Sequence, residues 1–251
     1  MSEPPPQPET DQPAHPFLLR YAGLPAARWG PGEVGIGILV AFGATFALTL
    51  LVALFDRTLE TPGAKDAAQL ALALALAGTA LAFAVADGGG RLKAGLGGLG
   101  LGRFGPPAIG LAGIALLAYL ASAVALGPLL SPDQKDITRE LGTDTGGVGS
   151  LIVSGLLIVV AAPLSEELFF RGFMFAGLRR RIPLWPAAIV SAAIWGALHL
   201  GGGNAGVAIQ LAIFGVILAW LYERSGTLWA PVIAHAVNNS LAFVLLVTDT
   251  V

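Results

Sequence analysis

The sequence predicts an all-α membrane protein, a bundle of seven transmembrane helices with room for an eighth, preceded by a disordered tail. Three observations predict this class. The 251 residues are 55% hydrophobic and 12% charged, and soluble domains carry about twice that charged share. The mean hydropathy is +0.75. Several apolar runs reach the length of about 20 residues that a helix needs to cross a bilayer.

Composition also excludes several functions. A net charge of −2 gives no reason to expect a nucleic-acid partner. The chain has no cysteine, which excludes disulfides, thiol catalysis and a cysteine-ligated zinc site. The partners that remain are the lipid bilayer itself and molecules that lie in it.

Residues 1–32 are polar and proline-rich, and no basic segment leads into a short apolar core as in a secretory signal. We expect a disordered cytosolic tail there. Behind it we expect scaffold spans over 33–148 and a core that carries the chemistry over 149–251.

The predicted spans are the long apolar segments of the chain. They are 34–55, 67–86, 107–130, 150–178, 184–200, 205–222 and 228–247. A soluble helical protein would need polar stripes every three to four residues, and the run QLALALALAGTALAFAVA has none. The segment 150–178 is unusually long. Its Pro163 should kink the helix just before the most polar stretch, so an eighth span stays open.

Lysine and arginine in the connections predict the orientation. With seven spans, the tail and the connections 87–106, 179–183 and 223–227 share one side and carry nine of these residues. The opposite side carries four. We therefore expect a multi-pass protein of the inner cell membrane with a cytoplasmic N-terminus. The GLGRFG stretch from Gly100 fits a dinucleotide-binding pattern, but no strand precedes it, so we expect a flexible loop instead.

Five ionisable residues lie in or near the predicted spans, and all of them are in the second half of the chain. They are Glu166, Glu167, Arg171, His199 and His235. Each costs on the order of 3 kcal/mol to insert, so such residues usually mark function. The last four spans should therefore carry the chemistry, and the first three should serve as scaffold.

Helical spacing separates the roles in SEELFFRG. Glu167 and Arg171 are four residues apart, with the acid first, and should form an ion pair on one face. Glu166 lies about 100° round the helix and is left as a free carboxylate suited to general-base work. The alternative is a purely structural clamp between helices.

Two histidine clusters follow. His199 ends a helix before three glycines, and alone it would be read as a satisfied buried histidine. His235 and Asn239 are four apart on one face and could form a structural pair. Together with a free glutamate, however, these groups can activate a water and offer donors to an oxyanion. They could instead hold a zinc ion through Glu166, His199 and His235.

The clusters EELFFR, WGALH and HAVNN, in this order, resemble the CPBP intramembrane proteases. That group contains the type II CAAX prenyl endopeptidases and the bacteriocin-processing or self-immunity (Abi) proteins. The resemblance covers about 151–244, including the phrase SGTLWAPVIAH. The second motif usually has phenylalanine four residues before the histidine, and here Trp195 takes that place.

The resemblance implies that Glu166 and His199 activate the hydrolytic water and that His235 and Asn239 stabilise the oxyanion. Glu167 and Arg171 would then hold the site in shape. It also implies a peptide or lipidated protein in the membrane as substrate. Members are described both as metalloproteases and as glutamate proteases, so zinc stays an open cofactor.

The sequence lacks features that other classes of membrane protein would show. No H-E-x-x-H, G-x-S-G or G-x-G-D motif occurs, which argues against three other intramembrane protease types. A proton-coupled transporter is the main alternative, because buried Glu, Arg and His also line proton paths, but inverted halves are not visible. An inactive immunity or scaffold relative would be expected to lack Glu166 or His199, and both are present.

Overall fold

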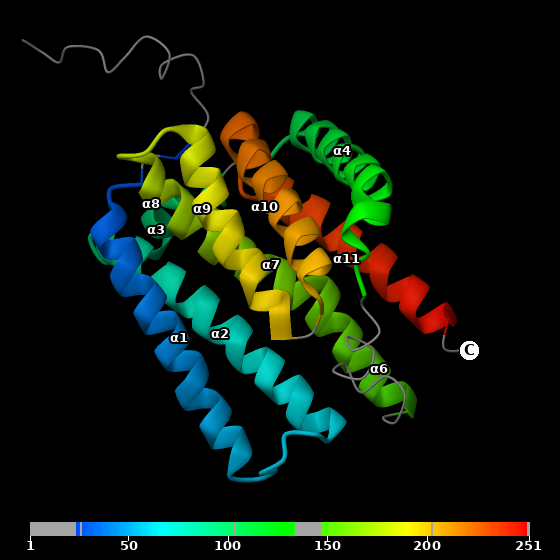
Figure 1. The fold of residues 1–251 in the computed structure, drawn as a ribbon. Helices are drawn as coiled ribbons and strands as arrows, with labels where there is room; N and C mark the ends of the chain where they lie inside the picture. The colour runs from blue at the N-terminus through cyan, green and yellow to red at the C-terminus, as the bar shows by residue number, and fades with distance from the viewer. Residues whose placement is uncertain (1–23, 26, 103, 134–146, 202, 250–251) are drawn as a thin grey trace, which may run out of the picture.

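The described part of the chain is built from helices that pack side by side around one central segment (Figure 1). The computed structural model describes residues 24–25, 27–102, 104–133, 147–201 and 203–249. The first helices are α1 (Pro31–Ala53), α2 (Pro62–Asp87), α3 (Leu92–Gly98) and α4 (Pro106–Leu130). A long segment follows, made of α6 (Gly147–Leu156), η1 (Leu157–Ala161), α7 (Ala162–Glu166), η2 (Glu167–Phe175) and α8 (Ala176–Arg179). The last elements are α9 (Leu184–Ala197), η3 (Leu198–Gly201), α10 (Ala205–Ser225) and α11 (Trp229–Asp249).

The predicted fold class is confirmed. Among the described residues, six helical segments are long and apolar enough to cross a membrane, and Trp229–Leu245 is a shorter apolar helix. The segment Gly147–Arg179 is one continuous candidate span of 33 residues, so the break at Pro163 does not create an eighth. Many side chains on the outer helices are exposed leucines, isoleucines and valines, as expected of surfaces that face lipid.

The segment from α6 to α8 forms the centre of the bundle. All nine residues of η2 are buried, because α1, α2, α9 and α10 all pack against it. The phenylalanines of η2 supply much of the core, and Phe173 reaches α1, where Gly37 leaves room for its ring. The polar residues of η2 are therefore enclosed by protein and not exposed to lipid.

Two stretches of this central segment are π-helical, η1 and η2, and they lie on either side of Pro163. Proline lacks an N–H and disturbs the backbone ladder of an α-helix, and π-turns are a known adjustment that often occurs at functional sites. The kink expected at Pro163 is thus realised as a change of helix type around α7.

Contacts place three of the connections predicted to share one side, 87–106, 179–183 and 223–227, at one end of the bundle. Arg179 forms a two-pronged ion pair with Glu223, at 2.8 and 2.6 Å, and so joins α8 to α10. The N–H of Leu228 donates to the carbonyl of Gly100, at 3.0 Å. At the other end, Asn204 donates to the carbonyl of Ser131, at 2.8 Å.

Two expectations about irregular segments need correction. Residues 1–23 lie outside the described residues, but the predicted tail does not extend to residue 32. Trp29 is 3% exposed and donates from Nε1 to the carbonyl of Phe173, at 2.8 Å, and an aromatic side chain of this size is stabilised by burial. The stretch that begins at Gly100 is not a free loop either. Thr227 and Leu228 both donate to the Gly100 carbonyl, and α3 precedes it.

Candidate active site

Three helical segments bring the candidate residues together around Trp195. Glu166 ends α7, Trp195 lies in the last turns of α9, and His235 lies in α11. The indole ring contacts His199 and His235 edge-on, each with ring centroids 5.3 Å apart. Residues that are widely separated in sequence therefore form one cluster.

Glu167 is the centre of the charged part of this cluster. Its Oε1 accepts from Nη1 of Arg171 at 2.8 Å, which is the ion pair predicted from the spacing, and it also contacts Nδ1 of His235 at 2.9 Å. All three side chains are at most 3% exposed. Ion pairs in such surroundings need several partners to offset desolvation, and here one carboxylate serves two helices.

Arg171 has a further partner that the sequence did not suggest. Its guanidinium carbon lies 4.5 Å from the centroid of the Trp195 ring, a cation–π contact that favours the charge away from water. Among the described residues, Oε2 of Glu167 and Nε and Nη2 of Arg171 are buried and have no hydrogen-bond partner. The aromatic face therefore contributes to holding the guanidinium.

Glu166 is not the free carboxylate that helical spacing predicted. It forms no ion pair within the described part of the chain, but its Oε2 accepts a hydrogen bond from Nε1 of Trp195, at 2.5 Å. The prediction considered only neighbours along one helix, whereas this donor comes from α9, 29 residues away. The signal that could have revealed it is the tryptophan in WGALH, because an indole N–H needs an acceptor when buried.

The partner of His199 fixes the role of each of its ring nitrogens. Nδ1 lies 3.0 Å from the carbonyl oxygen of Trp195. A carbonyl only accepts, so Nδ1 carries the proton, and Nε2 of a neutral ring is left as an acceptor. His199 is partly exposed, and Nε2 can therefore accept a hydrogen bond from a water.

Asn239 shares a helix with His235 but binds elsewhere. Its Nδ2 donates to the carbonyl of Ile158 in η1, at 3.0 Å, and its Oδ1 accepts weakly from Asn238, at 3.4 Å. An asparagine amide has two N–H donors, so one of them is already used by the backbone. The pairing with His235 that the spacing allowed is replaced by a contact between α11 and η1.

The residues do not fit a zinc site in this arrangement. A catalytic zinc needs three protein ligands close together. In the part of the chain that the structure describes, no three His, Asp or Glu side chains gather in this way. The side chains of Glu166, His199 and His235 are therefore not grouped closely enough to act together as zinc ligands in this arrangement.

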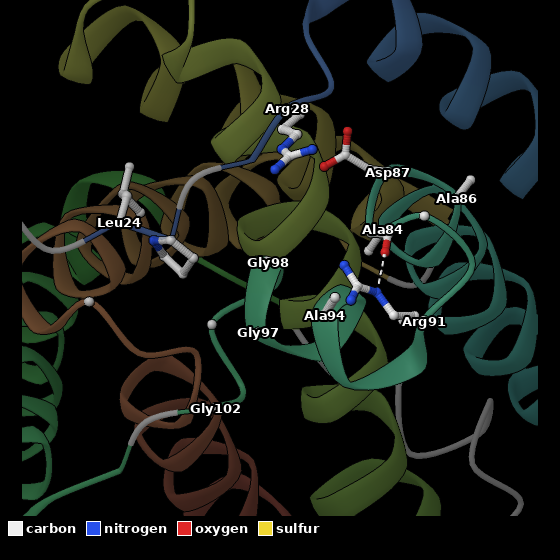
Figure 2. A pocket seen from close by; sticks show the side chains of 15 residues that line it. Leu24, Arg28, Ala84, Ala86, Asp87, Arg91, Ala94, Gly97, Gly98 and Gly102 are labelled. Atoms are coloured by element: carbon white, nitrogen blue, oxygen red, sulfur yellow. Dashed lines mark hydrogen bonds between the residues drawn. The ribbon is translucent and has the colours of Figure 1, made fainter.

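A cavity of about 720 Å³ lies elsewhere, at the end of the bundle that holds the Arg179–Glu223 pair. Figure 2 shows Arg28, Asp87 and Arg91 around it, with glycines of α3 and the following turn forming much of its wall. None of the motif residues lines this cavity. The cavity and the cluster therefore have separate linings.

Fold and cluster together define a multi-pass helical membrane protein with ionisable groups enclosed in its centre. Residues 148–241 match the model of a family described as type II CAAX prenyl endopeptidase Rce1-like. The matched segment runs from α6 into α11 and contains all three motifs. The family resemblance predicted from those motifs is thereby confirmed.

Three curated proteins are similar to parts of the chain. An uncharacterised 24.3 kDa protein of Escherichia coli is 28% identical over 129 residues, which are 51% of this chain and 59% of that protein. YdiL of Bacillus subtilis, named only provisionally as a membrane peptidase, is 27% identical over 36% of this chain and 37% of its own length. The uncharacterised YyaK of the same organism is 30% identical over 36% of this chain and 32% of its own length. The chain thus spans less than two thirds of each relative, and no solved structure matches it significantly.

Proposed function

We propose that this protein is an intramembrane endopeptidase that hydrolyses a peptide bond of a membrane-associated substrate. The observation that carries the proposal is the gathering of Glu166, His199 and His235, from three helical segments, around one buried tryptophan. The family match supports a CAAX-type membrane protease in general. A prenylated, CAAX-like peptide is the substrate class that this resemblance favours.

Glu166 and His199 activate the water in this proposal. Glu166 takes a proton from water while the water oxygen bonds to the scissile carbonyl carbon. Nε2 of His199 accepts the second hydrogen of that water and orients it, since its Nδ1 proton is committed to the carbonyl of Trp195. When the carbon–nitrogen bond breaks, the proton on Glu166 passes to the departing amine. Atoms and charges then balance without a further reactant.

His235 and Asn239 stabilise the oxyanion. Because Nδ1 of His235 donates to Glu167, its Nε2 can donate to an oxyanion only when the ring carries both protons. The amide hydrogen of Asn239 that Ile158 does not use is the second donor. No step of the proposal passes through a metal ion.

The test is cleavage of a defined panel by purified protein in nanodiscs. The panel holds a prenylated CAAX peptide and unmodified membrane-anchored peptides. We expect the wild-type protein to cleave at least one of them and Glu166→Gln to lower the rate about 10²- to 10⁴-fold, with little change in Tm. Glu60→Gln, at an exposed acid in the α1–α2 connection, is the matched control. Cleavage by Glu166→Gln at the wild-type rate would refute the mechanism. If the wild-type protein cleaved nothing, a transporter or an inactive relative would be favoured.

A further inference from the structure

Trp195 contacts four ionisable residues of the candidate site. Its Nε1 donates to Oε2 of Glu166. Its carbonyl accepts from His199. The face of its ring lies against Arg171, and the ring also meets His235 edge-on. Four ionisable groups therefore contact this one tryptophan.

The contacts of the ring fix the direction of its N–H. Trp195 is 1% exposed, and Phe214 of α10 adds a further ring contact at 6.3 Å between centroids. With Arg171 on one face and two histidines against the ring, the indole cannot turn without breaking several contacts. Its N–H therefore points to one place, and the Glu166 carboxylate occupies that place.

The hydrogen bond uses only one of the two oxygens of Glu166. A buried carboxylate with no tether could rotate about its side-chain bonds, and its terminal torsion is soft. A charge-assisted bond at 2.5 Å holds Oε2. Within the described residues, Oε1 of Glu166 has no hydrogen-bond partner, so it is the oxygen that can reach a water.

We propose that Trp195 is a positioning residue, whose indole N–H holds Oε2 of Glu166 so that Oε1 faces the attacking water. The inference rests on the proposed function, because it assumes that Glu166 is the general base. It goes beyond that function by assigning a role to the N–H group specifically. A phenylalanine at this position removes the donor together with the five-membered ring of the indole, and it leaves one aromatic ring at this buried position.

The test compares Trp195→Phe with wild type at saturating and limiting substrate. A base that is held less firmly slows the chemical step, so we expect kcat to fall about ten- to a hundredfold with KM changed less than about twofold. Trp185→Phe, at an exposed tryptophan of α9 that is 54% accessible, should leave both constants unchanged. If Trp195→Phe folds poorly, site-specific 3-benzothienylalanine, which has sulfur in place of the N–H at nearly the same shape, gives the same comparison.

A double-mutant cycle separates positioning from packing. In a Glu166→Gln background the carboxylate is already gone, so adding Trp195→Phe should lower the residual single-turnover rate by less than about twofold. An equally large loss in both backgrounds would overturn the positioning role, as would an unchanged kcat in Trp195→Phe while Glu166→Gln is inactive. A fully active Glu166→Gln protein would overturn the proposed function as well, so the two failures are distinguishable.

Discussion

The carbonyl oxygen of Ile158 accepts a hydrogen bond from a side chain of another helix. In the π-helical η1 the N–H of Ala162 bonds to Leu157, five residues earlier. The same pattern would assign Ile158 to the N–H of residue 163, which is proline and has none. Nδ2 of Asn239 takes that place, at 3.0 Å. A side chain of α11 therefore supplies the hydrogen bond that Pro163, three residues before Glu166, cannot donate.

Loss of this amide should leave a partly buried acceptor unsatisfied. We expect Asn239→Ala to lower the free energy of unfolding by about 1–3 kcal/mol, measured by denaturation in detergent micelles. In a Pro163→Ala background the cost should be smaller, because residue 163 then supplies an N–H. Ser240→Ala is the control, since Ser240 donates to Ala236 within α11. Equal costs in both backgrounds would show that Asn239 does not compensate for the proline.

Sequence reasoning predicted a contact along one helix but not the contacts between helices. The Glu167–Arg171 pair was predictable because both ends lie on one helix at a fixed spacing. The Trp195–Glu166 and Asn239–Ile158 bonds were not, because they join segments 29 and 81 residues apart. Spacing along one helix carries no information about which helix lies opposite.

At the scale of elements, α9 and α10 are held together by small residues. A Cβ built on Gly196 would lie 2.5 Å from the carbonyl oxygen of Ala208, and one on Gly215 would lie 2.8 Å from Cβ of Ala192. Close approach through glycine and alanine is a common way to join helices in membranes. Gly196 directly follows Trp195, so this contact also sets the position of the candidate site.

Gly196→Ala should force the two helices apart. The nearest atom is a backbone oxygen, which cannot rotate away as a side chain can. We expect a loss of about 1–3 kcal/mol in stability together with reduced cleavage, because Trp195 moves with α9. Gly78→Ala in α2 is the matched control: nothing lies within 4 Å of its added Cβ, and alanine favours a helix by about 1 kcal/mol. If both variants lowered Tm equally, the close contact between α9 and α10 would not matter.

The elements themselves were largely predictable, since each apolar run had the length of a span. Two features were not. Helix α3 lies in a glycine-rich stretch that was expected to be a loop, and it forms because it packs on α2. The π-turns of η1 and η2 could not be predicted from hydrophobic periodicity, because this segment is so apolar. Both depend on tertiary contacts that override local preference.

At the scale of the whole molecule, the contacts between connections and most of the positive charges of the connections lie at the same end of the bundle. The end of the bundle that joins Gly100 to Leu228 and Arg179 to Glu223 also holds most of the described lysines and arginines of the connections. They are Arg28, Arg91, Lys93, Arg179, Arg180, Arg181 and Arg224. The described positive charges that were predicted to share a side lie at one end, and from the positive-inside rule we propose that this end faces the cytoplasm.

Absence of cysteine makes this orientation directly testable, because any single introduced thiol reports its own side. We choose Ala94→Cys in α3 and Glu60→Cys in the α1–α2 connection, both at exposed positions on opposite ends of α2. In bacterial spheroplasts an impermeant maleimide should label Glu60→Cys at once and Ala94→Cys only after permeabilisation. The parent chain gives the background, and cleavage activity of each variant confirms the fold.

Reversed labelling would place the N-terminus outside, against the charge rule. Labelling of both positions from the same side would mean that α2 does not cross the bilayer, and the count of spans would then have to change.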